Sequence, residues 1–246
     1  NRDGRADAST LFATGFNVRA ALWQLLSNVS RENSYDVVVV LSRPVSRERA
    51  LAPFGSVPDV ARIEPWSGGQ GEVQSRVLST REGVGVVALP RTTELLHLRL
   101  LEGRWLLPSD ELEVVLNQQA WLAYDRPAVG SRFEVRIGAQ NAAVRLVGVA
   151  QQFEKAKLYV DQADFDARFN TDHAVTTLLF VGQREGFENV VALKRALERA
   201  VASSDLPVLY VMSHAERGRI IFDHLDIILM SLLLLSFLVL TVSAIG

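Results

Sequence analysis

The hydrophobic and polar positions of this chain separate most sharply near its C-terminal end. From Ile227 to Ile245 no residue is charged, and leucine, isoleucine, valine, phenylalanine and methionine fill most positions. Nineteen residues at a helical rise of about 1.5 Å extend roughly 28 Å, close to the hydrocarbon thickness of a bilayer. A helix buried in a soluble domain rarely stays apolar on every face for that length. We therefore predict a transmembrane helix over residues 223–246, preceded by a folded domain.

The first 33 residues carry an amphipathic pattern instead, in which apolar residues recur near the helical period and Arg19 excludes a membrane span. These apolar positions are Leu11, Phe12, Phe16, Leu22, Leu25, Leu26 and Val29. Ser9 or Thr10 is the candidate cap of this predicted helix, which should end near Ser30–Asn33. The polar start has no signal-peptide core. Because the predicted span stops at the last residue without a flank, we expect the chain to be a fragment of a longer protein.

Strand and helix patterns alternate between these two ends. Tyr35–Leu41 is a continuous β-branched run that predicts a strand buried on both faces and ended by Pro44. Ser46 is the candidate cap of a short helix, and Val60–Trp66 alternates like a strand. The same order returns later as a strand over Thr176–Val181, a helix over Phe187–Val201 and a strand over Val208–Met212. Two strand-helix-strand units are therefore expected to share a sheet, with a direct or a split connection within each unit.

The middle of the chain predicts mostly short elements. Glycines predict a turn at Ser67–Gly71, and Thr92 is the candidate cap of a helix through Leu98. The expected strands here are Val73–Leu78, Val84–Leu89, Glu113–Leu116 and Lys157–Val160. Helices are expected from Asn117 and over Asp161–Phe169, the latter capped by Asp161.

From Val129 onward, apolar and polar residues alternate on both sides of a turn at Gly138–Asn141. This pattern predicts a β-hairpin. The hairpin should belong to a small β-rich lobe inserted in the larger α/β part. The predicted fold class is α+β: a subdomain of two strand-helix-strand units with an inserted β-rich lobe, followed by a transmembrane helix.

Composition excludes several kinds of chemistry. The formal net charge is −2 and no lysine- or arginine-rich run occurs, so no nucleic-acid partner is expected. The chain has no cysteine, which excludes disulfides, thiolate catalysis and Cys-ligated zinc within it. No phosphate-binding loop and no GxSxG motif is present, so this chain by itself is not an ATPase.

No set of residues converges on a catalytic, cofactor-binding or metal site, and we predict neither enzyme activity nor a cofactor. The histidines are scattered at His97, His173, His214 and His224. The acidic stretch from Asp161 to Asp172 fails the calcium-loop pattern after two positions, which favours a solvated helix face. Trp105, Leu106 and Leu107 form either a partner surface or, as we favour, core packing.

Several short motifs occur in an order that resembles one family. A segment of the form L-x-G-R-x-L spans Leu101–Leu106, and VVLN at Val114–Asn117 and then Ala120 come after it. A Val-Gly pair at 129–130 and a V-G-V strand at 147–149 complete the order. Together with the C-terminal apolar run, these segments resemble the extracytoplasmic domain of MacB/FtsX-type ABC transporter permeases over about residues 30–246.

The resemblance implies an organisation for the whole chain. Residues 1–33 would be a stalk after a first transmembrane helix that lies before Asn1. Residues 34–104 and 157–222 would form a porter-like α/β subdomain, 105–156 the β-rich lobe, and 223–246 the second transmembrane helix. Residues 1–222 would then lie outside the cytoplasm, at the inner or plasma membrane. Arg217 and Arg219 point the other way, since positive residues favour the cytoplasmic side.

The same resemblance implies partners. These are an ABC ATPase subunit that supplies ATP hydrolysis, a second permease protomer, and a periplasmic or envelope protein. The implied substrates are lipoproteins, peptides or drugs. A different class of protein, the extracytoplasmic sensor domain of a receptor such as a histidine kinase, would share the order of domain and span. After Gly246 a permease would continue into further hydrophobic spans, whereas a receptor would continue into a signalling module.

Overall fold

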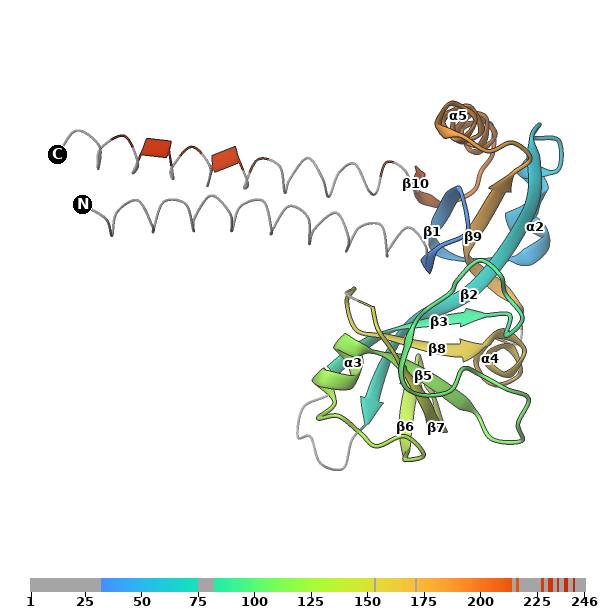
Figure 1. Cartoon of the computed structure of the whole chain (residues 1–246). Helices are drawn as coiled ribbons and strands as arrows, with labels where there is room; N and C mark the ends of the chain where they lie inside the picture. Colours follow the sequence, from blue (N-terminus) through green and yellow to red (C-terminus); the bar gives the residue numbers. More distant parts are fainter. Residues whose placement is uncertain are drawn as a thin grey trace. The chain divides into compact units, whose positions relative to one another are not determined.

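The computed structural model describes residues 32–74, 82–152, 154–170 and 172–213, together with a few single residues beyond them. The single residues are Glu216, Ile227, Met230, Ser231, Leu234, Phe237, Leu238 and Thr241. Ser34–Ser213 form one compact unit, and Asn1–Asn33 and His214–Gly246 belong to another (Figure 1). The predicted helices over 1–33 and 223–246 thus lie almost entirely outside the described residues. Within the described part of the chain, no helix combines the length and apolarity that crossing a membrane requires.

The compact unit has an α+β fold built on one mixed sheet of ten strands. Their order along the sheet is β10-β1-β9-β2-β3-β8-β5-β7-β4, and β6 pairs with β2 and β7. The strands are β1 (Val37–Ser46), β2 (Val60–Gln74), β3 (Glu82–Leu89), β4 (Leu100–Gly103), β5 (Glu113–Asn117), β6 (Arg132–Ile137), β7 (Gln140–Ala150), β8 (Lys157–Asp161), β9 (Ala174–Gly182) and β10 (Val208–Ser213). The helices within it are α2 (Arg47–Leu51), the 3₁₀ turn η1 (Ala52–Phe54), α3 (Gln118–Ala123), α4 (Gln162–Phe169) and α5 (Phe187–Ala202).

One half of the sheet contains two interleaved strand-helix-strand units, as predicted. β9 lies between β1 and β2 and is antiparallel to both, so the unit β1-α2-β2 is split. β1 in turn lies between β9 and β10, which α5 connects. The core of this half joins Leu193 and Leu197 of α5 to Val37 and Val39 of β1, and all four side chains are buried. Burial of this apolar face is what holds α5 on the sheet.

The other half of the sheet carries the helices α3 and α4. β3 pairs with β8, and β5 with β7, in parallel, while the remaining pairs are antiparallel. The predicted hairpin is confirmed as β6 and β7, with Ile137 opposite Gln140. A second core cluster fills this half and includes Val84, Val114, Leu116, Ala120, Leu146, Val160 and Phe165.

β2 belongs to both halves, which contradicts the turn predicted at Ser67–Gly71. Its first part pairs with β9 through Trp66, and its second part pairs with β3 from Ser67 onward. The glycines do not reverse the chain, and Gly68 allows a close approach to β3. A Cβ on Gly68 would lie 2.3 Å from the carbonyl oxygen of Val86 in β3. Only glycine permits the two backbones to come this near.

Three other local predictions are wrong. Residues 92–98 form turns and extended chain without a helix, because the Thr93 hydroxyl accepts the N–H of Leu95 and offers the backbone a different local bond. Pro44 does not end β1, which resumes pairing at Val45 after an irregularity in its register. Ser46 precedes α2 but makes no side-chain cap bond.

β4 was not expected from the sequence. The division into residues 34–104 with 157–222, and 105–156, stays a prediction.

Candidate functional site

Two glycines of the sequence motifs face each other across β4 and β7. Gly103 is paired with Gly148 in the strand register. A Cβ on Gly103 would lie 2.2 Å from the carbonyl oxygen of Val147, and one on Gly148 would lie 2.3 Å from that of Arg104. Gly103 also has a φ of +72°, a conformation that side chains disfavour. Both positions therefore require glycine for the two strands to meet.

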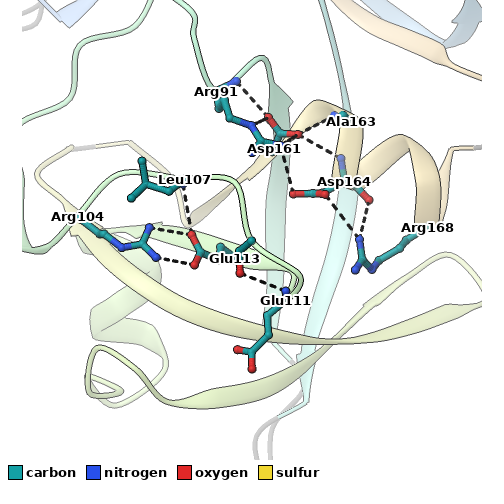
Figure 2. A network of polar contacts seen from close by, with 10 residues as sticks. Arg91, Arg104, Leu107, Glu111, Glu113, Asp161, Ala163, Asp164 and Arg168 are labelled. Carbon is teal, nitrogen blue, oxygen red and sulfur yellow. Dashed lines mark hydrogen bonds and ion pairs between the residues drawn. The ribbon is translucent and has the colours of Figure 1, made fainter.

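The arginine after Gly103 neutralises a buried carboxylate, as Figure 2 shows. The guanidinium of Arg104 donates from Nη1 to Oε2 of Glu113 at 2.8 Å and from Nη2 to Oε1 at 2.5 Å. The backbone N–H of Leu107 adds a bond to Oε2 at 3.3 Å. Only 4 % of the Glu113 side chain is exposed. The hydrogen bonds from Arg104 lower the pKa of Glu113 by more than its burial raises it.

Asn117, the last residue of the VVLN motif, connects three elements. It is fully buried at the end of β5. Its Oδ1 accepts the N–H of Ala120 at 2.9 Å, which caps α3, and the N–H of Lys157 at 2.9 Å, which ties β8 to the same point. Gly130 of the Val-Gly pair donates its N–H to the carbonyl oxygen of Leu146 in β7 at 2.7 Å. The family motifs thus meet around β4, β5 and β7, where they hold strands together.

A second ion pair holds the start of α4. Arg91 binds Asp161 with two side-chain bonds, Nε to Oδ2 and Nη2 to Oδ1, both 2.9 Å long (Figure 2). Asp161 also accepts the N–H groups of Ala163 and Asp164, so it caps α4 as predicted. Burial would raise the pKa of Asp161, but the bonds from Arg91 and the backbone outweigh it, and the pKa is lowered. For Asp164 burial and the charge of Asp161 raise the pKa.

These opposite shifts predict the pH dependence of stability. A carboxylate whose pKa is lowered by folding stabilises the folded protein at pH values above its ordinary pKa, which is 3.8 for aspartate. This contribution to the free energy of unfolding is lost as the pH falls through the folded pKa. For a carboxylate whose pKa is raised by folding, the contribution to the free energy of unfolding changes with pH in the opposite direction. In urea titrations between pH 7 and pH 3, Asp161→Asn is expected to flatten the acid-side decline in the free energy of unfolding. Asp164→Asn, its matched neighbour, is expected to steepen that decline.

The same slope for both variants would contradict this account. The acid-side decline that remains in Asp161→Asn is expected to come in part from Glu113, whose pKa is also lowered.

Next to this ion pair, a surface hollow of about 380 Å³ lies between the segment 91–99 and the start of β4. Its lining residues are Arg91, Thr93, Leu96, His97, Leu98, Arg99, Leu100 and Trp105. None of them is acidic. Trp105 packs on the buried ring of Tyr159, with ring centroids 5.8 Å apart. The hollow therefore combines cationic and apolar surface and is the best candidate for contact with another molecule.

Comparison with known proteins agrees with this geometry. A family model described as the MacB-like periplasmic core domain matches residues 9–200. The chain belongs to this family. The periplasmic region of MacB from Actinobacillus actinomycetemcomitans has the same fold, with a TM-score of 0.52 at 14 % identity over 80 % of this chain and 97 % of that structure. The extracellular domain of YknZ, a noncanonic ABC-type transporter from Gram-positive bacteria, gives a TM-score of 0.46 at 12 % identity, covering 72 % and 99 %. No curated protein matches.

The family match makes this chain a MacB-like periplasmic core domain. The residues singled out in the sequence lie in different environments in the structure. Leu106 is buried and Trp105 partly buried in the core, whereas 53 % of Leu107 is exposed. His97 lines the hollow, and His173 lies 3.2 Å from Asp166. His214 and His224 lie outside the described residues.

The residues that the structure describes contain no group of three or more acidic or histidine side chains arranged to hold a metal ion. Sequence reasoning did not predict the hollow of this MacB-like domain, although Trp105 of its lining was named as part of a possible partner surface. Its lining comes from a segment predicted as helix and from an unpredicted strand. The one available signal was the pair of basic residues His97 and Arg99 flanking Leu98, next to the family motif at Leu101.

Proposed function

We propose that this domain belongs to a permease subunit that acts with a separate nucleotide-binding subunit, whose ATP hydrolysis drives export or handling of an envelope substrate. The observation that carries the proposal is the family match over residues 9–200. The chain has no phosphate-binding loop of its own. In this proposal it therefore receives mechanical work from another subunit.

The proposal includes the topology expected from the sequence. Residues 1–222 lie outside the cytoplasm at the inner or plasma membrane, and 223–246 enter the bilayer. A second permease protomer completes the assembly, and a periplasmic or envelope protein contacts the domain. The substrate is a lipoprotein, a peptide or a drug. The receptor sensor domain was supported only by the order of domain and span, which a permease shares. Membership of the MacB-like family therefore favours the permease.

The single sheet supports a role in transmitting movement. Ser34–Ser213 form one compact unit, and β2 contributes Val73, Ile63 and Trp66 to its three core clusters. A continuous, hydrogen-bonded sheet with packed cores moves as a rigid body more readily than it deforms. The domain is thus suited to convert a change at the membrane into displacement of its distal surface.

A spin-label experiment on the full-length permease with its nucleotide-binding subunit tests this proposal. The chain has no cysteine, so Leu122→Cys on the exposed side of α3 can carry a nitroxide on each protomer once any cysteine elsewhere is removed. We expect one main inter-protomer distance by pulsed electron paramagnetic resonance. This distance should change when ATP is added. When hydrolysis is blocked in the nucleotide-binding subunit, it should keep the value of the ATP-bound state.

The matched control measures a distance inside one protomer. Leu122→Cys combined with Leu209→Cys labels two exposed leucines of the compact unit. With labelled protomers diluted by unlabelled ones, this distance should stay constant in every nucleotide state. An inter-protomer distance that does not change with ATP would refute the coupling to ATP hydrolysis. If no inter-protomer distance were detected, the pairing of two protomers would be refuted.

A further inference from the structure

β4 is the last strand of the sheet and has an open edge. It pairs with β7 on one side, and no other strand of the described residues pairs with its other side. Leu101, Glu102 and Gly103 of this strand are exposed, with 42 % of Leu101 accessible. Unpaired backbone N–H and C=O groups at such an edge can accept an added strand.

The hollow begins where this edge begins. Leu100, the first residue of β4, is part of its lining, and so is Trp105 just beyond the strand. A strand that pairs with the open edge of β4 and continues past Leu100 would therefore reach the hollow. Strand addition obtains affinity from main-chain hydrogen bonds and specificity from pockets beside the strand.

Charge selects the kind of side chain that fits. The lining contains Arg91, His97 and Arg99 and no carboxylate. Arg91 is already bound to Asp161. His97 and Arg99 are exposed, and within the described residues neither side chain has a hydrogen bond or an ion pair. Arg99 is thus free to bind a carboxylate of an incoming chain.

We propose that the β4 edge and its hollow bind an extended segment of a partner protein in which acidic residues alternate with apolar or β-branched ones. The segment adds a strand to β4 and places a carboxylate against Arg99, while its next inward side chain packs on Leu98 and Trp105. This inference rests on the proposed function, since it names the chemistry of the envelope partner.

A second copy of this chain fits the edge less well. β4 is only four residues long, has an irregular register and carries Glu102, all features that disfavour sheet-to-sheet pairing. Pairing with a second copy would also bring a second cationic hollow close to the first. An extended acidic segment brings no second cationic hollow, and it needs only a short stretch of pairing along β4, with its carboxylates placed toward Arg99 and away from Glu102.

Defined peptides test the binding with the full chain in lipid nanodiscs. The probes are short, capped, fluorescein-labelled peptides in which glutamate alternates with threonine, the same peptide with lysine for glutamate, and the glutamate peptide N-methylated at alternate residues. By fluorescence anisotropy the glutamate peptide should bind at least about tenfold more tightly than either of the others. Arg99→Glu should weaken its binding by about tenfold, whereas Arg43→Glu, at an exposed arginine of β1, should not change it.

Disulfide trapping locates the bound peptide. Leu101→Cys should capture a glutamate peptide that carries one cysteine, and Leu122→Cys should not, although the two leucines are similarly exposed at 42 % and 40 %. Equal capture at both sites, binding that tolerates N-methylation, or no binding at all would overturn the inference. Rapid disulfide dimers of the Leu101→Cys chain would overturn it too, in favour of a second copy. None of these results would affect the ATP-dependent distances between protomers. The proposed function can therefore be correct even if this inference is wrong.

Discussion

Replacing Gly148 with alanine is expected to lower the free energy of unfolding by about 3 kcal/mol. The added methyl group would sit 2.3 Å from the carbonyl oxygen of Arg104, which belongs to backbone and cannot swing aside. The strands β4 and β7 would have to separate where Gly103 and Gly148 face each other. That separation costs ladder hydrogen bonds as well as packing.

Gly69→Ala is the matched control for this substitution. Gly69 also lies within a strand, and among the described residues no atom lies within 4 Å of the position where its Cβ would be. Its replacement should change stability by no more than about 0.5 kcal/mol. Urea denaturation of both variants, monitored by circular dichroism, compares them directly. If Gly148→Ala unfolded at the wild-type midpoint, the close approach of β4 and β7 would not exist in solution.

Arg104→Met is expected to destabilise the domain by about 2–3 kcal/mol, because it leaves the Glu113 carboxylate buried without its partner. The value lies at the low end for a buried pair, since 43 % of the Arg104 side chain is exposed and water screens part of the interaction. Combining Arg104→Met with Glu113→Leu should recover most of the loss, since removing both charges leaves no uncompensated group. Chemical denaturation of the two single variants and the double variant forms the required cycle.

A solvent-exposed pair provides the comparison. Arg132 and Glu111 form a 2.5 Å ion pair with side chains that are 64 % and 41 % exposed. Arg132→Gln should leave the denaturation midpoint nearly unchanged. Equal losses for Arg104→Met and Arg132→Gln would show that burial of Glu113 does not decide the energy. Additive losses in the double variant would show that Arg104 and Glu113 act independently.

The sequence predicts this fold well where burial and capping act locally. The β-branched run at Tyr35–Leu41 became the first half of β1, and the alternation around Gly138–Asn141 became the β6–β7 hairpin. Asn117 and Asp161 each cap the next helix along the chain, because a short polar side chain before a helix has few other ways to satisfy the first N–H groups.

Local patterns failed where tertiary contacts decide the structure. The glycines at 68–71 resemble a turn in sequence, yet they lie within β2, where Gly68 permits the close approach to β3 that the local pattern does not reveal. The leucines after Thr92 have helical spacing, but Leu95, in a bend, and Leu96, in an isolated bridge, are buried in a third core cluster. Tertiary burial overrides helix propensity in such a segment.

The candidate site shows the same limit. Its family motifs were visible in the sequence, but their function in joining strands was not. Gly103 and Gly148 are too far apart in sequence to be paired without the sheet register. The hollow depends on how two irregular segments lie beside β4, and no periodicity encodes that arrangement.

The shared strand β2 gives the domain a mechanical property. Pairing passes from β9 at Trp66 to β3 at Ser67 with no unpaired residue between them, so β2 stays hydrogen-bonded as it crosses from one half of the sheet to the other. The strand's fifteen residues reach up to about 50 Å at the usual rise of a strand. A tilt of roughly 10° at one end of such a lever would move the other end by about 9 Å. Torque applied at the β9 end of β2 would thus reach the β6–β7 hairpin through a single strand, as a swing of that size.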